Sequence, residues 1–223
     1  MNMSSIRISL IYFFFLFIVV SCKDNAVTYD ACGYFEAEEW TISSSVAGKL
    51  VEFDIKDGDN VVKGQKLGLV DTVQLQLQKD LLLLQPKSKM RDLQEKQINY
   101  QLEQCTIRAV EAGVVVGKYA KKGEMIAIGY PLGQIAGMEN MYLRMYVTAK
   151  QMSDIKIGQE VSITLSDVAT RYTGKIEWIS SIAEFTPKTI QTEDERQNMV
   201  YAVKVFVKND GAIKIGSYAE VSF

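Results

Sequence analysis

The sequence predicts a mainly β chain: a two-layer β-sandwich of two related halves, a short α-helical hairpin inserted between the halves, and a β-barrel domain after them. Three observations predict it. Two segments repeat each other at an offset of 65 residues, a glycine-free stretch rich in leucine and glutamine separates them, and the C-terminal part is rich in β-branched and aromatic residues. The expected boundaries are 33–70 and 106–137 for the sandwich, 71–105 for the hairpin and 138–223 for the barrel.

The composition excludes several classes of function. The net charge is −2 and no strongly basic block occurs, so the sequence offers no surface for nucleic acid. The 223 residues include no histidine. This removes the commonest general base and metal ligand, and with them a Ser-His-Asp triad or a zinc protease site. We therefore expect no catalytic residue, no cofactor and no metal site, and a protein that is not an enzyme.

The N-terminus is typical of an exported lipoprotein. Leu10–Val20 is an unbroken apolar run behind one basic residue. As a helix it would be about 17 Å long, too short for a hydrocarbon core of about 30 Å. Ser21-Cys22 follows and resembles the bacterial lipobox, in which the cysteine becomes the lipid-carrying first residue. We expect residues 1–21 to be a signal peptide, Cys22 to be lipidated and residues 22–32 to form a linker; a retained membrane anchor is the alternative.

Two further cysteines, Cys32 and Cys105, are expected to be partly buried thiols. An exported chain can form disulfides. However, the repeat aligns position 105 with position 40 (105 − 65 = 40), and Cys32 lies eight residues before Trp40. Eight residues of extended strand cover about 26 Å. This separation argues against a bond between the two sulfur atoms.

The repeat places glycines and apolar residues at matching positions in the two halves. The glycines suit turns because glycine takes a positive φ without penalty. One half has too little core to be stable alone, so the halves must pack together. The matched glycines are Gly48, Gly58 and Gly64 in the first half and Gly113, Gly123 and Gly129 in the second. The expected core positions are Leu50, Val61, Leu67, Val115, Ile126 and Leu132.

This twofold arrangement resembles the biotinyl/lipoyl carrier fold. In such carriers the modified lysine lies at the turn that joins the halves, in a Met-Lys-Met or Asp-Lys-Ala setting. Here residues 71–105 replace that turn, and the segment Lys87-Ser88-Lys89-Met90 within them matches neither pattern. The comparison therefore favours the fold without the carrier chemistry.

Residues 71–105 are expected to form two antiparallel helices of 14–17 residues, about 21–26 Å long. Pro86 cannot continue a helix from its interior, so we place the chain reversal there. The absence of glycine and the strong helix formers argue against a disordered loop. Leu93, Gln97, Tyr100 and Gln104 have the spacing of one helix face, which is half apolar. The candidate partner contact is the exposed tip: Gln85, Pro86, Lys87, Ser88 and Lys89.

Three motifs follow one another along the chain: Thr106-Ile107-Arg108-Ala109 before Gly113-Val114-Val115, Glu184-Phe185-Thr186-Pro187-Lys188-Thr189-Ile190-Gln191-Thr192, and Lys214-Ile215-Gly216-Ser217-Tyr218-Ala219-Glu220-Val221. In this order they resemble the haemolysin D (HlyD)-like membrane fusion proteins, the periplasmic adaptor subunits of efflux and secretion systems. The resemblance covers residues 33–70 and 105–223. Val110 stands where the family has a proline in its entry to the second half.

The resemblance implies a homo-oligomeric adaptor that couples an inner-membrane pump, an ABC-type permease, to export. It implies a place in the cell envelope, lipid-anchored and facing the periplasm, with the inner membrane favoured over the outer. The hairpin is shorter than in the family and has no Arg…Leu…Ser pattern at its tip, which argues against docking to an outer-membrane channel. The alternatives are a lipoyl or biotinyl acyl carrier and an envelope scaffold lipoprotein without a transport role.

Overall fold

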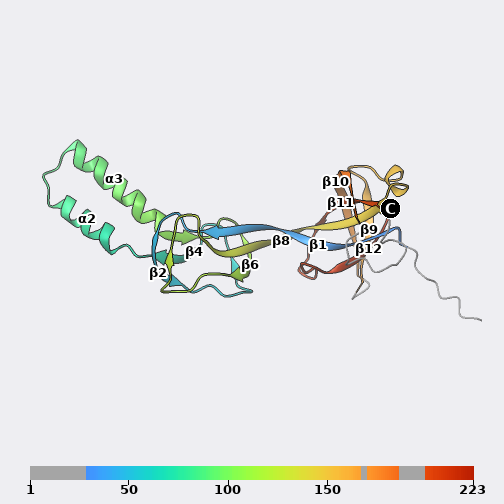
Figure 1. The fold of residues 1–223 in the computed structure, drawn as a ribbon, viewed down its shortest axis with the longest axis horizontal. Helices are drawn as coiled ribbons and strands as arrows, with labels where there is room; N and C mark the ends of the chain where they lie inside the picture. Colours follow the sequence, from blue (N-terminus) through green and yellow to red (C-terminus); the bar gives the residue numbers. More distant parts are fainter. Residues whose placement is uncertain (1–28, 167–169, 186–198) are drawn as a thin grey trace, which may run out of the picture.

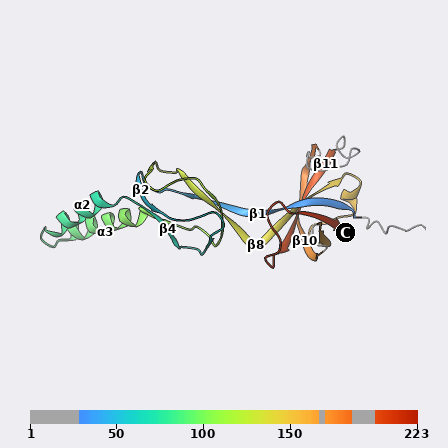
Figure 2. The same ribbon diagram turned by 90° about the horizontal axis from the view of Figure 1, so that it is seen from below.

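The computed structural model describes residues 29–166, 170–185 and 199–223. The molecule is elongated, with a helical hairpin at one end, a β-barrel at the other and a sandwich between them (Figures 1 and 2). None of the described helices is long and apolar enough to cross a membrane. The elements are β1 (Ala31–Ser43), β2 (Gly48–Phe53), β3 (Asn60–Val61), β4 (Lys66–Val70), α2 (Val73–Leu83), α3 (Lys89–Gln104), β5 (Thr106–Arg108), β6 (Gly113–Lys118), β7 (Met125–Ile126), β8 (Pro131–Thr148), the 3₁₀ helix η1 (Gln151–Ser153), β9 (Glu160–Leu165), β10 (Arg171–Phe185), β11 (Met199–Lys208) and β12 (Tyr218–Ser222).

Two long antiparallel strands, β1 and β8, run through both β domains (Figure 1). Their alternating side chains enter two separate cores: Phe35 lies in the barrel core and Ile42 in the sandwich core. Residues 33–37, which the sequence analysis assigns to the sandwich, are therefore part of the barrel in this structure. The physical reason is that one long strand serves both domains: its inward-facing side changes near the irregularity between Ala37 and Glu38, so the residues before and after this point enter different cores.

The sandwich has the twofold relation that the repeat predicts. In the first half Gly48 pairs with Ile126, and at the matching place in the second half Gly113 pairs with Val61. The two turn glycines are equivalent as well, because Gly58 has φ 91° and Gly123 has φ 97°. Only glycine adopts such angles freely. The offset of 65 residues is thus confirmed as a structural repeat.

The core of the sandwich contains every apolar residue that the repeat predicts. Cys105 is buried in the same core, and Trp40 packs against it from β1, as the alignment of positions 105 and 40 implies. Cys32 lies in the barrel part of β1, opposite Tyr146. The two cysteines therefore lie in different domains, and the prediction of no disulfide between them is confirmed. The predicted core residues, all buried, are Leu50, Val61, Leu67, Val115, Ile126 and Leu132.

The barrel closes on itself. Its strands follow the order β1-β12-β9-β10-β11-β8, and β8 returns to pair with β1. Closure removes unpaired strand edges, which would otherwise invite aggregation. Alternate residues of β8 fill the interior: Met141, Leu143, Met145 and Val147 are all completely buried. The predicted fold class, a sandwich split by a short helical hairpin and followed by a barrel, is confirmed.

Candidate functional site: the helical hairpin

The hairpin is shorter on one side than the sequence predicts. Helix α3 has 16 residues, within the expected 14–17, but α2 has only 11. At its start, the Asp71 carboxylate accepts a hydrogen bond from the backbone N–H of Val73 at 2.9 Å, which fixes the first turn there. At its end, α2 stops at Leu83 because the chain needs the following residues to reverse around Pro86.

The predicted tip is exposed and is held in shape by two hydrogen bonds. Ser88 is the N-cap of α3, and its hydroxyl accepts from the backbone N–H of Arg91 at 3.2 Å. The Arg91 guanidinium donates to the carbonyl of Gln85 at 3.0 Å, across the reversal. The structure therefore brings the tip residues together as one ordered turn, although their contact with a partner stays a prediction. All five are exposed: Gln85, Pro86, Lys87, Ser88 and Lys89.

The two helices bury little of their apolar surface against each other. In α2 only Leu82 is buried, and no residue of α3, which the structure describes completely, is buried. Most hairpins of this size gain their stability by turning their apolar residues toward the partner helix. In this hairpin only Leu82 is fully buried in this way, while several other apolar side chains stay exposed.

The outer edge of α2, which we call the α2 edge, is an exposed apolar stripe. It consists of Val73, Leu77, Leu81 and Leu84, with exposed fractions of 58%, 52%, 65% and 83%. Their spacing of four, four and three residues places them on one side of the helix. The buried Leu82 lies on the other side, toward α3.

The outer edge of α3, the α3 edge, also carries exposed apolar side chains. Leu93 and Tyr100 are 62% and 63% exposed and belong to the half-apolar face that the sequence indicates. Gln97, which the sequence places on the same face, borders the groove between the two helices. Ile98, five residues after Leu93, is half-buried and turned toward α2. The hairpin thus presents two different apolar edges, pointing away from each other, and each can pack against a further helix.

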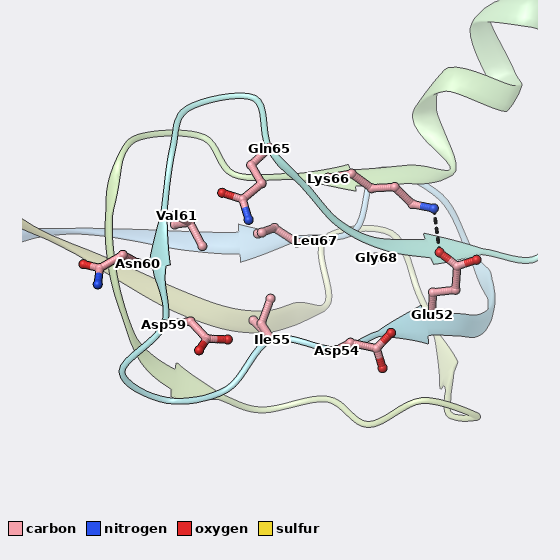
Figure 3. A pocket seen from close by; sticks show the side chains of 10 residues that line it. All are labelled: Glu52, Asp54, Ile55, Asp59, Asn60, Val61, Gln65, Lys66, Leu67 and Gly68. Atoms are coloured by element: carbon pink, nitrogen blue, oxygen red, sulfur yellow. Dashed lines mark hydrogen bonds and ion pairs between the residues drawn. The ribbon is translucent and has the colours of Figure 1, made fainter.

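The sandwich has an open pocket of about 380 Å³ beside the turn that follows β2 (Figure 3). Its polar groups largely serve the fold. Lys66 forms an ion pair with Glu52 at 2.5 Å, and the Asp59 carboxylate accepts from the backbone N–H of Lys56 at 2.8 Å. The Gln65 side chain likewise accepts a turn N–H. These residues stabilise turns and strand contacts, so the hairpin remains the stronger candidate.

Three other kinds of site were considered from the sequence: a carrier lysine, a metal site and a lipidation site. Lys87 and Lys89 belong to the exposed segment between α2 and α3. The hairpin replaces the tight turn between the two halves of the sandwich and projects away from them (Figure 1). Across the described residues, no group of three or more Cys, Asp and Glu side chains is placed to hold a metal ion. Cys22, the predicted lipidation site, lies outside the described residues.

Comparison with known sequences finds membrane proteins. No protein-family model matches the chain. The UPF0194 membrane protein YbhG of Salmonella arizonae is 29% identical over 124 residues, which is 55% of this chain and 38% of that protein. A UPF0194 membrane protein of Acidithiobacillus ferridurans is 30% identical over 110 residues, covering 49% and 32% of the two chains. The matched region therefore spans less than two fifths of these relatives.

Comparison with solved structures finds membrane fusion proteins. A MacA–MexA chimera that contains the Pseudomonas aeruginosa MexA α-hairpin domain aligns with a TM-score of 0.67 and 18% identity, over 86% of this chain and 78% of the chimera. The membrane fusion protein Spr0693 of Streptococcus pneumoniae aligns with a TM-score of 0.62 and 19% identity, over 86% and 96%. At these identities the likeness establishes a shared fold.

Proposed function

We propose that this chain, which has the fold of the membrane fusion proteins, is a lipid-anchored adaptor that faces the periplasm and links an inner-membrane transporter to export. The chemistry of transport belongs to the transporter, and the adaptor contributes no catalytic residue. One observation carries the proposal. The hairpin stands at the far end of the molecule with both apolar edges exposed, a costly arrangement for a single chain in water (Figure 1).

The two edges suit assembly with further copies of the chain. They differ from each other: the α2 edge is purely aliphatic, whereas the α3 edge combines a leucine with a tyrosine. Contact between two different patches of the same molecule is head-to-tail, and it closes into a ring when the rotation permits. We therefore propose that the α2 edge of one copy packs on the α3 edge of the next, so that the hairpins form a wall.

The anchor is proposed at Cys22. The described chain enters the barrel at Asp30, whose backbone N–H bonds the carbonyl of Val221 in β12. Cys22 and Tyr29 are seven positions apart, a reach of at most about 25 Å. An acylated Cys22 would therefore hold the barrel at the membrane and let the hairpin project away from it. Cys22→Ala should leave the precursor uncleaved or release the protein without lipid; normal processing with bound lipid would contradict the anchor.

An ABC-type permease is the proposed transporter, because the resemblance to the haemolysin D-like adaptors favours pumps of the inner membrane. The hairpin is too short to extend far across the periplasm. Helix α3 has 16 residues and is about 24 Å long, little for bridging the periplasm. Direct docking to an outer-membrane channel is accordingly not part of the proposal.

The assembly is tested by placing charges on the α2 edge. Leu77→Glu with Leu84→Glu should leave the melting temperature nearly unchanged, because both side chains are exposed, while the assembled form in ultracentrifugation is lost. The control is Val62→Glu with Ile157→Glu, at apolar positions 65% and 68% exposed elsewhere on the surface. An edge variant that assembles as the parent does, and still supports export in cells, would refute the proposal.

Two other functions make different predictions. An acyl carrier would bear lipoyl or biotinyl on a lysine, and the mass of the intact protein would reveal the adduct. A scaffold lipoprotein would carry the lipid but would purify from membranes without a permease. The adaptor proposal predicts no lysine adduct, together with a membrane permease and its ATPase that co-purify with the parent in stoichiometric amounts.

A further inference from the structure

One broad side of the hairpin is a groove without charged side chains. The groove lies between α2 and α3 and has a volume of about 440 Å³. Five glutamines line it, with Leu82 and Ile98 between them, and Leu81 of the α2 edge also borders it. None of these described lining residues carries a charge. The glutamines are Gln78, Gln85, Gln94, Gln97 and Gln101.

The opposite broad side is charged. Two residues along an α-helix correspond to about 200° of rotation, so a residue two positions after a groove residue points to the other side. By this rule Asp80 lies opposite Gln78, Lys96 opposite Gln94, Asn99 opposite Gln97 and Glu103 opposite Gln101. Three of these four residues carry a charge, and Asn99 is a neutral amide. The hairpin therefore has two apolar edges, one amide side and one charged side.

We propose that the amide side is the inner wall of the ring and that the charged side faces outward. This inference rests on the ring assembly proposed above. Neighbouring copies meet at the α2 and α3 edges, so each broad side must point either toward the axis or away from it.

Symmetry decides between the two orientations. A ring brings identical side chains together around its axis, where Asp80 or Glu103 would face its own copies and like charges would repel. A glutamine amide has both donors and an acceptor, so copies of Gln97 can hydrogen-bond to one another or to water. Placing the amide side toward the axis therefore causes less repulsion between copies than placing the charged side there. Such a wall offers hydrogen bonds without fixed charge, which suits a solute rich in hydroxyl or amide groups.

Matched charge changes on the two sides test the orientation. The inner-wall variant is Gln94→Glu, Gln97→Glu and Gln101→Glu; the outer variant is Lys96→Glu with Asn99→Asp. Each lowers the net charge of the chain by three at exposed positions of α3. Circular dichroism and the melting temperature show whether each variant retains its helices.

Assembly of the full chain is then measured by ultracentrifugation at low and high salt. The inner-wall variant should assemble about ten-fold more weakly at about 0.02 M salt and recover near 1 M, where the Debye length falls to about 3 Å. The outer variant should stay within about two-fold of the parent. An outer variant that is weakened as much as the inner one, or an inner variant that assembles normally at low salt, would overturn the orientation.

Chemical labelling gives a second measurement. Gln97→Cys should react with a small maleimide in the assembled protein and resist a maleimide carried on a large polymer, whereas Asn99→Cys should react with both. Adding Leu77→Glu and Leu84→Glu should open Gln97→Cys to the large reagent. If the parent assembles but Asn99→Cys is the variant that resists the large reagent while Gln97→Cys reacts with both, only the assignment of the amide side as the inner wall is overturned. A parent that sediments as a single chain overturns the ring itself, and the two failures are thereby distinguished.

Discussion

Asn209 is a buried polar residue that holds the segment after β11 against the middle of β8, and we predict that Asn209→Ala is strongly destabilising. It follows the end of β11 and is only 9% exposed. Its amide group donates to the carbonyl of Met138 at 2.8 Å and to that of Ile213 at 3.0 Å. Its oxygen accepts from the N–H groups of Gly211 at 2.9 Å and Ile213 at 3.0 Å. Four hydrogen bonds thus depend on one side chain.

The size of the destabilisation depends on how deeply the hydrogen-bond partners of Asn209 are buried. Ile213 is fully buried, so its N–H and carbonyl would lose their partner in a place that water reaches poorly. Each such unsatisfied group costs about 1–3 kcal/mol. Gly211 is exposed and Met138 half-buried, so water can replace most of those two bonds. We expect Asn209→Ala to lower the free energy of unfolding by about 3–5 kcal/mol and the melting temperature by roughly 6–15 °C.

The assay is urea unfolding followed by circular dichroism and tryptophan fluorescence, with Lys208→Ala as the control. Lys208 is the exposed neighbour, and its replacement should change stability by less than about 0.5 kcal/mol. Asn209→Asp keeps the two acceptor contacts but buries a charge and loses both donors, so it should also destabilise, and less so at low pH, where the carboxyl is protonated. An Asn209→Ala protein within about 1 kcal/mol of the parent would refute the reasoning.

Three other substitutions test separate parts of the fold. Leu132→Gly removes a fully buried side chain from the sandwich core and should cost about 4 kcal/mol in urea unfolding. Ser88→Ala removes the N-cap of α3 and should cost about 1 kcal/mol, seen as reduced helical circular dichroism, while the barrel is unchanged. The N–H of Ala212, which bonds the Asp210 carboxylate, lowers the pKa of that group. A lowered pKa stabilises the fold above the unfolded value of about 4 and loses this effect as the pH falls, so the stability advantage over Asp210→Asn should shrink between about pH 6 and pH 3.

The twofold sandwich could be predicted because its signals are local and repeated. Turn glycines such as Gly58 and Gly123 mark positions that tolerate few other residues, and the same offset relates the core residues around them. The length of β1 could not be predicted in this way. Phe35 and Ile42 are seven positions apart, so the inward-facing side of the strand changes between them, and nothing in the sequence shows that these residues serve two different cores.

The candidate site was predicted only in part. The leucine-rich segment and the reversal at Pro86 indicate a hairpin, yet periodicity alone leaves open which face of each helix meets the other. Leu77 and Leu82 are both apolar, and only the packing distinguishes the exposed one from the buried one. The groove does have a sequence signal, because Gln94 and Gln101 are each followed two positions later by a charged residue, but this signal can be interpreted only once the inner face of the hairpin is known.

The irregular pairing of β1 and β8 at the junction between the domains explains the position of Asn209. The β1–β8 register jumps between Ala37, which pairs with Met141, and Glu38, which pairs with Gly137, so residues 138–140 have no counterpart in β1. Extra residues of this kind bend a strand and interrupt its ladder, here at the place where the two cores meet. Asn209 bonds this segment through its side chain to Met138 and through its backbone N–H to the Glu139 carbonyl at 2.9 Å. The bulge is therefore held by the barrel, and the direction of the sandwich and the hairpin relative to the barrel depends on these bonds as well as on the two long strands.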